Sequence, residues 1–262
     1  MTAQSDVGAW EAPRMVDQPE PPRSGTQAID RALGLLRVFE GADGDLGITA
    51  LASACDLSIS TTHRLVKALA TAGLVAQDPA TERYHLGASL VTLGRRAESR
   101  LGIDRWTAVL EDLASRTGES ASLGTRIGPH VLIAAHVPSA QPLRFDAGQG
   151  SRVPIHASAM GKMLLALSDD PGAEIAALGA LERFTRHTLA DPDSLLADLV
   201  VIRARGWSLN DGERHDGVRA VAVAIPTTAG VSTSAIAVQG PALRLTDDRL
   251  DAVYADLRAA VA

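Results

Sequence analysis

The feature that most constrains the fold is a pair of short helical patterns separated by one turn, within residues 49–73. Thr49 and Ser58 are each expected to cap one of these helices, because a hydroxyl can accept a hydrogen bond from the free amides of a first helical turn. Asp56 begins the turn between them, and Gly73 suits the left-handed residue that commonly ends a helix. Four residues face a shared core: Leu51, Ala52, Leu65 and Leu69. The segment therefore predicts a helix-turn-helix.

The residues on either side complete a small domain. Upstream, four apolar residues at helical spacing predict an amphipathic helix that stops at Gly41: Ile29, Leu33, Leu36 and Phe39. Downstream, LVAQ and RYHL flank the loop DPATE, which contains Asp78 and Pro79 and predicts a β-hairpin. Three helices followed by a hairpin are typical of a winged helix-turn-helix, in which the hairpin is the wing.

The chain is much longer than this domain. Its 262 residues, 46% of them hydrophobic and 21% charged, are enough for two packed units. We expect residues 1–23, which contain four prolines among charged and small residues, to form a flexible arm. Residues 24–87 are then the winged helix-turn-helix, residues 88–100 a linker helix, and residues 101–262 a second domain.

The second domain alternates between helical and strand patterns. Helices are expected at 105–117, 158–167, 173–178 and 193–205, and from Thr246, which caps the last one, to the C-terminus. The first of them turns Trp106, Val109, Leu110 and Leu113 inward. The helix at 193–205 carries one apolar face of Leu195, Leu196, Leu199 and Ile202. Strands are expected at 120–126, 131–137, 218–225 and 232–238. Short hairpins between strands predict an α+β domain with an antiparallel sheet.

Composition narrows the possible functions. Acidic residues stand where a signal peptide would need a basic start, and no run of eighteen apolar residues occurs, so we expect a cytoplasmic protein without a membrane segment. Cys55 is the single cysteine, which excludes an internal disulfide and a cysteine-based metal site. A net charge of −6 argues against non-specific coating of nucleic acid, and 3% aromatic residues are too few for stacking on single strands. A local surface for duplex DNA remains open.

No enzyme motif stands out in the second domain. Lys162 follows a glycine, but His156 occupies the place where a phosphate-binding loop needs its first glycine, and Met163 the place where it needs Ser or Thr. No spacing of Ser, His and Asp residues singles out a catalytic triad. We favour structural roles for the histidines, with His156 either packing or satisfying a backbone group and His215 pairing with Asp216 in a loop. No metal or other cofactor is expected.

The helix that starts after Ser58 presents a donor-rich face. The residues expected to contact DNA from it are Ser60, Thr61, Thr62, His63, Arg64 and Lys67. Small hydroxyls allow close approach to phosphates and base edges, Arg64 can form two hydrogen bonds to guanine or a phosphate, and Lys67 adds a charge. No acidic residue occurs between Leu57 and Thr71. Arg83 and His85 in the wing are expected to contact the neighbouring groove or backbone of the DNA.

Two other interpretations compete with DNA binding. Residues 24–98 carry seven basic and eight acidic residues, which suits a three-helix module that binds protein instead. An enzyme whose second domain processes a small metabolite, with the first domain as an interaction module, is the other alternative, and it needs a catalytic base that the sequence does not reveal. The helix-turn-helix arrangement favours DNA.

Short motifs in a fixed order make the chain resemble the IclR family of bacterial transcription regulators. In the first domain they are RALGLL, TALA, STTHRL, AGLV and YHLG. In the second they are GES near residue 118, PIHASAMGK at 154–162, FTRHT at 184–188, RARGWSLNDGE at 203–213 and GPALRLTDDRL at 240–250. The resemblance covers residues 24–250. It implies a winged helix-turn-helix, a linker helix and a GAF-like effector-binding domain, assembling as homodimers or dimers of dimers.

The residues around Ser158 suit a site for a small organic acid. Ser158 is expected to cap a helix whose first amides, at Ala159, Met160 and Gly161, are left open to a carboxylate by small side chains, although close helix packing explains the same residues equally well. The resemblance favours the site, and by similarity the effector residues are Val153, Ala159, Met160, Gly161, Asn210, Ala220, Ala237 and Gln239.

This chain departs from its relatives at four of those positions. Ala220 replaces a common cysteine, Ala237 and Gln239 replace serines, and Asn210 replaces an aspartate. Removing a hydroxyl usually rejects the ligand that needed it, so glyoxylate and pyruvate are not expected effectors. The changes favour a larger, partly apolar acid.

These observations predict a ligand-responsive regulator that binds double-stranded operator DNA, with repression favoured over activation by family habit. Two recognition helices of a dimer would contact half-sites about 34 Å apart, or a multiple of that, on a pseudo-palindromic operator.

Overall fold

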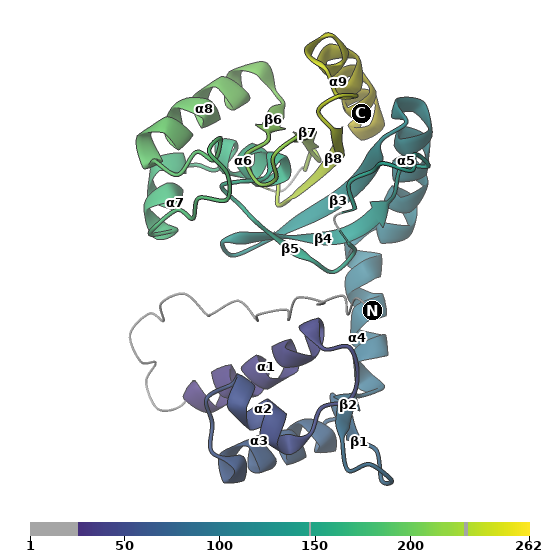
Figure 1. The fold of residues 1–262 in the computed structure, drawn as a ribbon, viewed down its shortest axis with the longest axis vertical. Coiled ribbons are helices and arrows are strands. Elements are labelled where there is room, and N and C mark those ends of the chain that lie inside the picture. The colour runs from purple at the N-terminus through teal and green to yellow at the C-terminus, as the bar shows by residue number, and fades with distance from the viewer. Residues whose placement is uncertain (1–25, 147, 228–229) are drawn as a thin grey trace, which may run out of the picture. The chain divides into compact units, whose positions relative to one another are not determined.

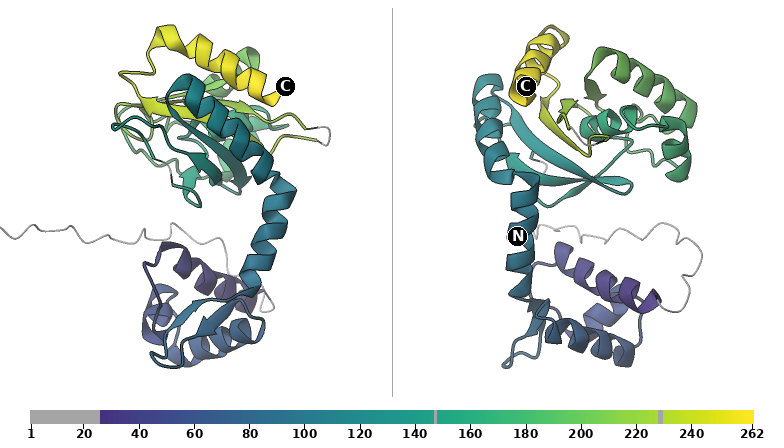
Figure 2. Two further views of the ribbon diagram at one scale, coloured as in Figure 1. Left: turned by 90° about the vertical axis from the view of Figure 1, so that its right-hand side faces the viewer. Right: turned by 180° about the vertical axis from the view of Figure 1, so that it is seen from behind.

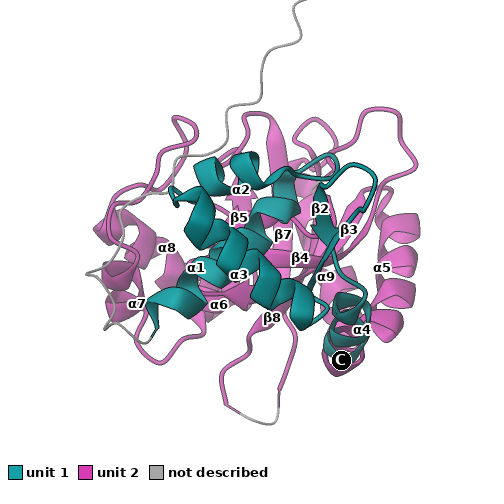
Figure 3. Cartoon of the chain, turned by 90° about the horizontal axis from the view of Figure 1, so that it is seen from below, with its two compact units in different colours: residues 1–97 teal, residues 98–262 magenta. Residues whose placement is uncertain are grey.

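The computed structural model describes residues 26–146, 148–227 and 230–262 (Figure 1). It divides the chain between Ala97 and Glu98 into an N-terminal unit and a C-terminal unit (Figure 3). The arm expected at residues 1–23 lies outside the described residues. Within the described ranges, no helix has both the length and the apolar composition needed to cross a membrane.

The N-terminal unit consists of three α-helices and a β-hairpin, as the sequence predicts. Its helices are α1 (Gln27–Val38), α2 (Ile48–Ala54) and α3 (Ile59–Thr71), with a short 3-10 turn, η1 (Phe39–Gly41), after α1. Strands β1 (Val75–Gln77) and β2 (Tyr84–Leu86) pair antiparallel to form the wing. Helix α4 (Ser89–Leu101) follows and contains the division between the units. The core gathers Leu35, Phe39, Leu51, Leu65, Val66, Leu69, Val75 and Tyr84.

The sequence predicts both ends of α3 correctly but misplaces the cap of α2. Ser58 caps α3, because its hydroxyl accepts a hydrogen bond from the Thr61 amide at 3.2 Å. Gly73 follows α3 with a φ of 69°, and the next amide, of Leu74, donates back to the carbonyl of Leu69. Thr49 as a cap is wrong, because α2 starts at Ile48 with Gly47 in the capping position.

The apolar stripe expected on α1 is partly wrong. Phe39 is buried, but Ile29 and Leu33 are 59% and 48% exposed, and Leu35 is buried instead. Apolar residues occupy two faces of this helix, and only the face with Leu35 packs against α2 and α3. Periodicity alone does not say which face a neighbouring helix will cover.

The C-terminal unit is built on a six-stranded antiparallel sheet in the order β5-β4-β3-β8-β7-β6. Its strands are β3 (Ser120–Ile127), β4 (His130–Val137), β5 (Arg152–Pro154), β6 (Ser208–Asp211), β7 (Val218–Ala224) and β8 (Ser234–Pro241). Its helices are α5 (Ile103–Thr117), α6 (Ala159–Ala166), α7 (Pro171–Ala177), α8 (Pro192–Arg205) and α9 (Asp247–Val261). The α+β class with an antiparallel sheet is confirmed, and β5 and β6 are the strands that the sequence pattern did not reveal.

Helices cover both faces of this sheet (Figure 2). The side chains that the sheet presents to these helices differ in size between the two faces. Helices α5 and α9 pack on one face, where β8 presents Ile236 and Val238. Helix α6 packs on the other face, where the same strand presents Ala235 and Ala237. Successive side chains of a strand point to opposite faces of the sheet. Strand β8 therefore places large side chains in one core and small side chains in the other.

Two details of the helices differ from expectation. Leu196 is 36% exposed, whereas the other three residues of its expected face are buried: Leu195, Leu199 and Ile202. Thr246 precedes α9 in the capping position, but its side chain makes no capping hydrogen bond.

Replacing Ser58 with alanine removes the cap of α3. Loss of such a cap costs about 1 kcal/mol, so we expect the α3 amides to exchange about fivefold faster with solvent, as measured by hydrogen exchange and mass spectrometry. Ser53→Ala is the matched control, because Ser53 is exposed within α2, and exchange in α3 should stay within twofold of the parent protein. Unchanged exchange in Ser58→Ala would contradict the cap.

Candidate functional site

The exposed face of α3 is the first candidate site, in the N-terminal unit. Ser60, His63, Arg64 and Lys67 are exposed, and Thr61 is half-buried with its hydroxyl bonded to that of Ser58. Among the described residues, no hydrogen bond or ion pair engages the side chains of His63, Arg64 and Lys67. These groups are therefore available to a partner.

Thr62 does not belong to that face. It is 0% exposed, and its hydroxyl donates to the backbone carbonyl of Ser58 at 3.1 Å. Its expected contact with DNA is wrong, because one turn of helix places Thr62 beside the buried Leu65 and Val66 rather than beside Arg64.

Arg83 lies directly before β2, the second strand of the wing, and is exposed. Its guanidinium donates to the backbone carbonyl of Asp45 at 2.9 Å, which ties the wing to the loop before α2. That contact leaves the remaining guanidinium donors free to bind a phosphate.

The second candidate site is a cavity on the α6 side of the sheet in the C-terminal unit, called here the α6 cavity. Its lining comprises Ile133, Phe145, Val153, Ala157, Ser158, Ala159, Met160, Asn210, Arg214, His215, Val218, Ala220, Ala237 and Gln239. Seven of the eight residues expected to bind an effector belong to this set. They come from β5, from the first turn of α6, and from β6, β7 and β8.

Strand register explains why residues far apart in sequence meet there. Asn210 lies opposite Ala220, and Ala220 lies opposite Gln239, so the three form one row across β6, β7 and β8. Ala237 occupies the neighbouring row, opposite Ala222. The alanines leave space beneath α6 that larger side chains would fill.

Gly161 is the expected effector residue that the cavity does not include. A Cβ atom built on it would lie 2.0 Å from the carbonyl oxygen of Ile155, so glycine is needed for close packing. Its amide is also taken, because it donates to the Ser158 hydroxyl at 3.2 Å. An open amide at Gly161 is therefore wrong, whereas the amides of Ala159 and Met160 have no acceptor within the described part of the chain.

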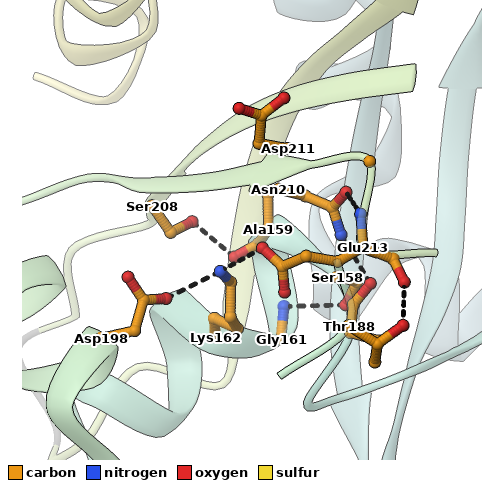
Figure 4. Close-up of polar contacts among 12 residues, drawn as sticks. Ser158, Ala159, Gly161, Lys162, Thr188, Asp198, Ser208, Asn210, Asp211 and Glu213 are labelled. Carbon is orange, nitrogen blue, oxygen red and sulfur yellow. Dashed lines mark hydrogen bonds and ion pairs between the residues drawn. The ribbon is translucent and has the colours of Figure 1, made fainter. Parts of the chain in front are cut away.

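A buried ion cluster lies beneath the first turn of α6 (Figure 4). The Lys162 ammonium is 2.5 Å from a carboxylate oxygen of Glu213 and 2.7 Å from one of Asp198. Lys162 is only 1% exposed. These three side chains, called here the Lys162 cluster, join α6, α8 and the loop after β6. Sequence reasoning considered Lys162 only as part of a phosphate-binding loop and missed this role.

Neutral hydrogen bonds reinforce the same junction (Figure 4). The Asn210 amide group donates to the Ala157 carbonyl at 2.6 Å, and its side-chain oxygen accepts from the Glu213 amide at 3.2 Å. The Ser208 hydroxyl donates to the Ala159 carbonyl at 2.5 Å, and the Thr188 hydroxyl to the Glu213 carbonyl at 2.5 Å. Asn210 therefore lines the cavity as a structural residue whose polar atoms are already bonded.

The Glu213 carboxyl sits in an unusual electrostatic environment. Burial raises its pKa above the ordinary glutamate value, against the opposing effect of the Lys162 charge. Its second carboxylate oxygen is buried and has no hydrogen-bond partner among the described residues. Such a carboxylate depends on Lys162 to remain charged.

A polar chain continues from the cavity into the sheet. The Gln239 amide group donates to the Ser122 hydroxyl at 3.1 Å, and that hydroxyl lies 2.9 Å from Nδ1 of His136. Nε2 of His136 lies 3.0 Å from an Asp146 oxygen. The Ser-His-Asp order is that of a hydrolase triad, but Ser122 is 0% exposed, so it cannot attack a substrate.

The histidines divide into structural and cavity-lining residues. Nε2 of His156 lies 2.9 Å from the Glu182 carbonyl, which confirms its pairing with a backbone group. His215 instead lines the cavity, with its ring 5.3 Å from that of Phe145, so its expected structural role as the loop partner of Asp216 is wrong. The other lining residues missed from sequence are Ile133, Phe145, Ala157, Arg214 and Val218. Arg214 and His215 could have been suspected from the sequence, because they directly follow Glu213 at the end of the motif RARGWSLNDGE.

Comparison with known proteins assigns the two units. Residues 28–79 match the IclR helix-turn-helix domain, and residues 99–262 match the family described as bacterial transcriptional regulator IclR C-terminal. The chain is 37% identical over 231 residues to the HTH-type transcriptional regulator BhcR of Paracoccus denitrificans, covering 87% of this chain and 82% of that protein. It is 32% identical over 229 residues to the HTH-type transcriptional repressor AllR of Salmonella typhimurium, covering 87% and 84%.

A solved structure supports the same assignment. A putative IclR transcriptional regulator from Silicibacter sp. TM1040 superposes with a TM-score of 0.80 at 26% identity, over 89% of this chain and 93% of that one. The matched relatives are named as regulators, which argues against the enzyme alternative.

Replacing Lys162 with methionine leaves a buried Glu213 carboxylate without its cation. Removing one partner of a buried ion pair costs about 3–5 kcal/mol, and we expect that loss in the free energy of unfolding, measured by urea titration with tryptophan fluorescence. The double variant Lys162→Met, Glu213→Gln serves as the control, because no buried charge is left unpaired, and it should recover at least half of the loss. A single variant that loses less than about 1 kcal/mol would contradict the structural role of the cluster.

Proposed function

The chain belongs to the IclR family of bacterial transcriptional regulators, and on that premise we propose that it is a repressor that binds operator DNA through α3 and responds to an organic acid in the α6 cavity. The observation that carries the proposal is the unpaired, donor-rich face of α3. In the cell such a protein acts where the chromosome lies, in the cytoplasm.

Helix α3 supplies the chemistry that duplex DNA recognition requires. Arg64 can donate two parallel hydrogen bonds to guanine in the major groove, and Ser60 and His63 can approach neighbouring base edges or phosphates. Lys67 adds a phosphate contact one turn further along. Arg83 supports the wing against the sugar-phosphate backbone. No acidic side chain between residues 57 and 71 opposes the DNA charge.

The α6 cavity suits a carboxylate with an apolar body. Its walls are formed largely by Ile133, Val153, Met160, Ala220 and Ala237. The free amides of Ala159 and Met160, at the positive end of α6, supply donors for a carboxylate. The scarcity of hydroxyls around them argues against a small 2-oxo acid.

Regulation requires that the acid bind the DNA-competent and DNA-incompetent forms with different affinities. Helix α4 spans the division between the units without a break. We propose that it transmits the change, as a rigid element whose two ends belong to different units. Repression is favoured because AllR relatives carry the name of repressors.

We also propose that the protein acts as a homodimer or a dimer of dimers. Large apolar side chains of the N-terminal unit are exposed on α1 and α4: Ile29, Leu33, Val91 and Leu93. A second copy of the chain would bury these residues and place two copies of α3 on one operator.

The DNA proposal is tested by the double variant Arg64→Ala, Lys67→Ala. We expect at least a tenfold loss of affinity for a duplex selected from a random pool by the parent protein, together with a shallower dependence on salt. Fluorescence anisotropy at two salt concentrations measures both.

Its control is Arg31→Ala, Arg37→Ala, which removes the same charge from exposed positions on α1. That variant should bind within twofold of the parent protein. Equal losses in both double variants would mean that overall charge, rather than α3, determines binding.

The dimer proposal is tested by Leu33→Glu and Val91→Glu together. Two carboxylates placed in an apolar interface should shift the chain toward monomer in sedimentation velocity at micromolar concentration. Leu243→Glu is the control, because Leu243 is 87% exposed in the other unit. A double variant that sediments like the parent protein would rule out this surface.

A further inference from the structure

Arg214 is a charged residue without a charged partner on the wall of the α6 cavity. It follows Glu213 in the loop after β6 and is half-buried. Among the described residues, no carboxylate lies within ion-pair distance of it and no hydrogen bond engages its side chain. A partly desolvated guanidinium in this state is the group that an anionic ligand would stabilise most.

The surroundings of Arg214 make this lack of a partner significant. Burial lowers its pKa below the ordinary arginine value, because nearby apolar groups replace water. The neighbouring carboxylates are already engaged: Glu213 pairs with Lys162, and Asp211 pairs with Arg219 at 2.6 Å. Asp216 lies in the same loop but is not within ion-pair distance of Arg214, so the guanidinium is left able to pair with an anionic ligand.

The loop that carries Arg214 is held in place. Glu213 is fixed by Lys162, by the Asn210 side chain and by the Thr188 hydroxyl. These contacts set where the next residue starts. A ligand therefore meets a loop whose backbone is held in place before binding, with the Arg214 guanidinium free to pair with it.

Gln239 defines the second polar contact of the cavity. The Ser122 hydroxyl lies 2.9 Å from Nδ1 of His136, whose Nε2 is 3.0 Å from an Asp146 oxygen but makes no hydrogen bond among the described residues. The Ser122 oxygen accepts from the Gln239 amide group. This hydrogen bond, 3.1 Å long, directs the NH₂ of Gln239 to Ser122, and the Gln239 carbonyl oxygen accepts no hydrogen bond from the described residues.

We propose that Arg214 binds the carboxylate of the effector and that the Gln239 carbonyl oxygen accepts a hydrogen bond from an effector hydroxyl. The effector class is therefore a hydroxy-carboxylate with an apolar body. The inference rests on the effector response proposed above and adds two specificity-determining residues, one of which sequence reasoning missed.

The experiment measures binding without DNA, by isothermal titration calorimetry on the full chain. The probes are the hydroxybenzoates and the hydroxy monocarboxylates of four to eight carbons. Each is compared with its primary amide, which lacks the charge, and with its deoxy acid, which lacks the hydroxyl. We expect at least one hydroxy acid to bind, its amide at least thirtyfold more weakly, and its deoxy acid about tenfold more weakly.

Variants then assign each contact. Arg214→Gln should weaken the acid at least thirtyfold and make acid and amide equal, and Arg214→Lys should bind the acid more tightly than Arg214→Gln. Gln239→Met should make hydroxy and deoxy acids equal. Arg258→Gln, which removes the same charge from an exposed position on α9, is the control and should bind like the parent protein.

Two results would overturn the inference: an acid that binds Arg214→Gln as tightly as the parent protein, or a panel from which no acid binds. A different result would reject the proposed function alone. If the acid binds through Arg214 but leaves the affinity for the selected duplex unchanged, the binding site stands and the regulatory response fails.

Discussion

The ion cluster of Lys162, Asp198 and Glu213 is the interaction on which the C-terminal unit depends most. A lysine that is 1% exposed is tolerated only when its charge is compensated, and the two carboxylates come from separate segments, α8 and the loop after β6. Their pairing therefore holds three elements in one arrangement. The first turn of α6 and the loop that carries Arg214 both line the cavity, so the cluster affects the shape of the site as well as its stability.

Side-chain size on the two faces of the sheet explains why a cavity exists there. Strand β8 directs Ile236 and Val238 toward α5 and α9, where they fill the core. It directs Ala235 and Ala237 toward α6, and β7 adds Ala222 opposite Ala237 and Ala220 in the next row. A face of small residues beneath a helix leaves space, and the same helix supplies free amides at its N-terminus. The alternation of large and small side chains along β8 thus fills the core on one face of the sheet and leaves space for a ligand on the other.

Local chemistry determines how much of this the sequence can predict. The helix-turn-helix, the cap at Ser58 and the left-handed Gly73 follow from residues close in the chain, as do the hairpin wing and the α+β class. Strands β5 and β6 are only three and four residues long, which is too short for the alternation of apolar and polar residues that identifies a strand. The buried Thr62 and the exposed Leu33 depend on which helix face meets a neighbour. Arg214 and the Lys162 cluster require contacts between segments far apart in sequence, which one sequence does not reveal; for the effector residues, resemblance to a family supplied that information.

The central claim is that one small molecule in the C-terminal unit and DNA at the N-terminal unit affect each other's binding. Thermodynamic linkage makes the effect reciprocal: the factor by which an acid changes operator affinity must equal the factor by which the operator changes acid affinity. The decisive measurement is calorimetric titration of a binding hydroxy acid into the free protein and into the protein saturated with operator duplex. If the two sites are coupled, the affinities for the acid differ by about 5–150-fold between the two titrations. Equal affinities in the two titrations would contradict the claim.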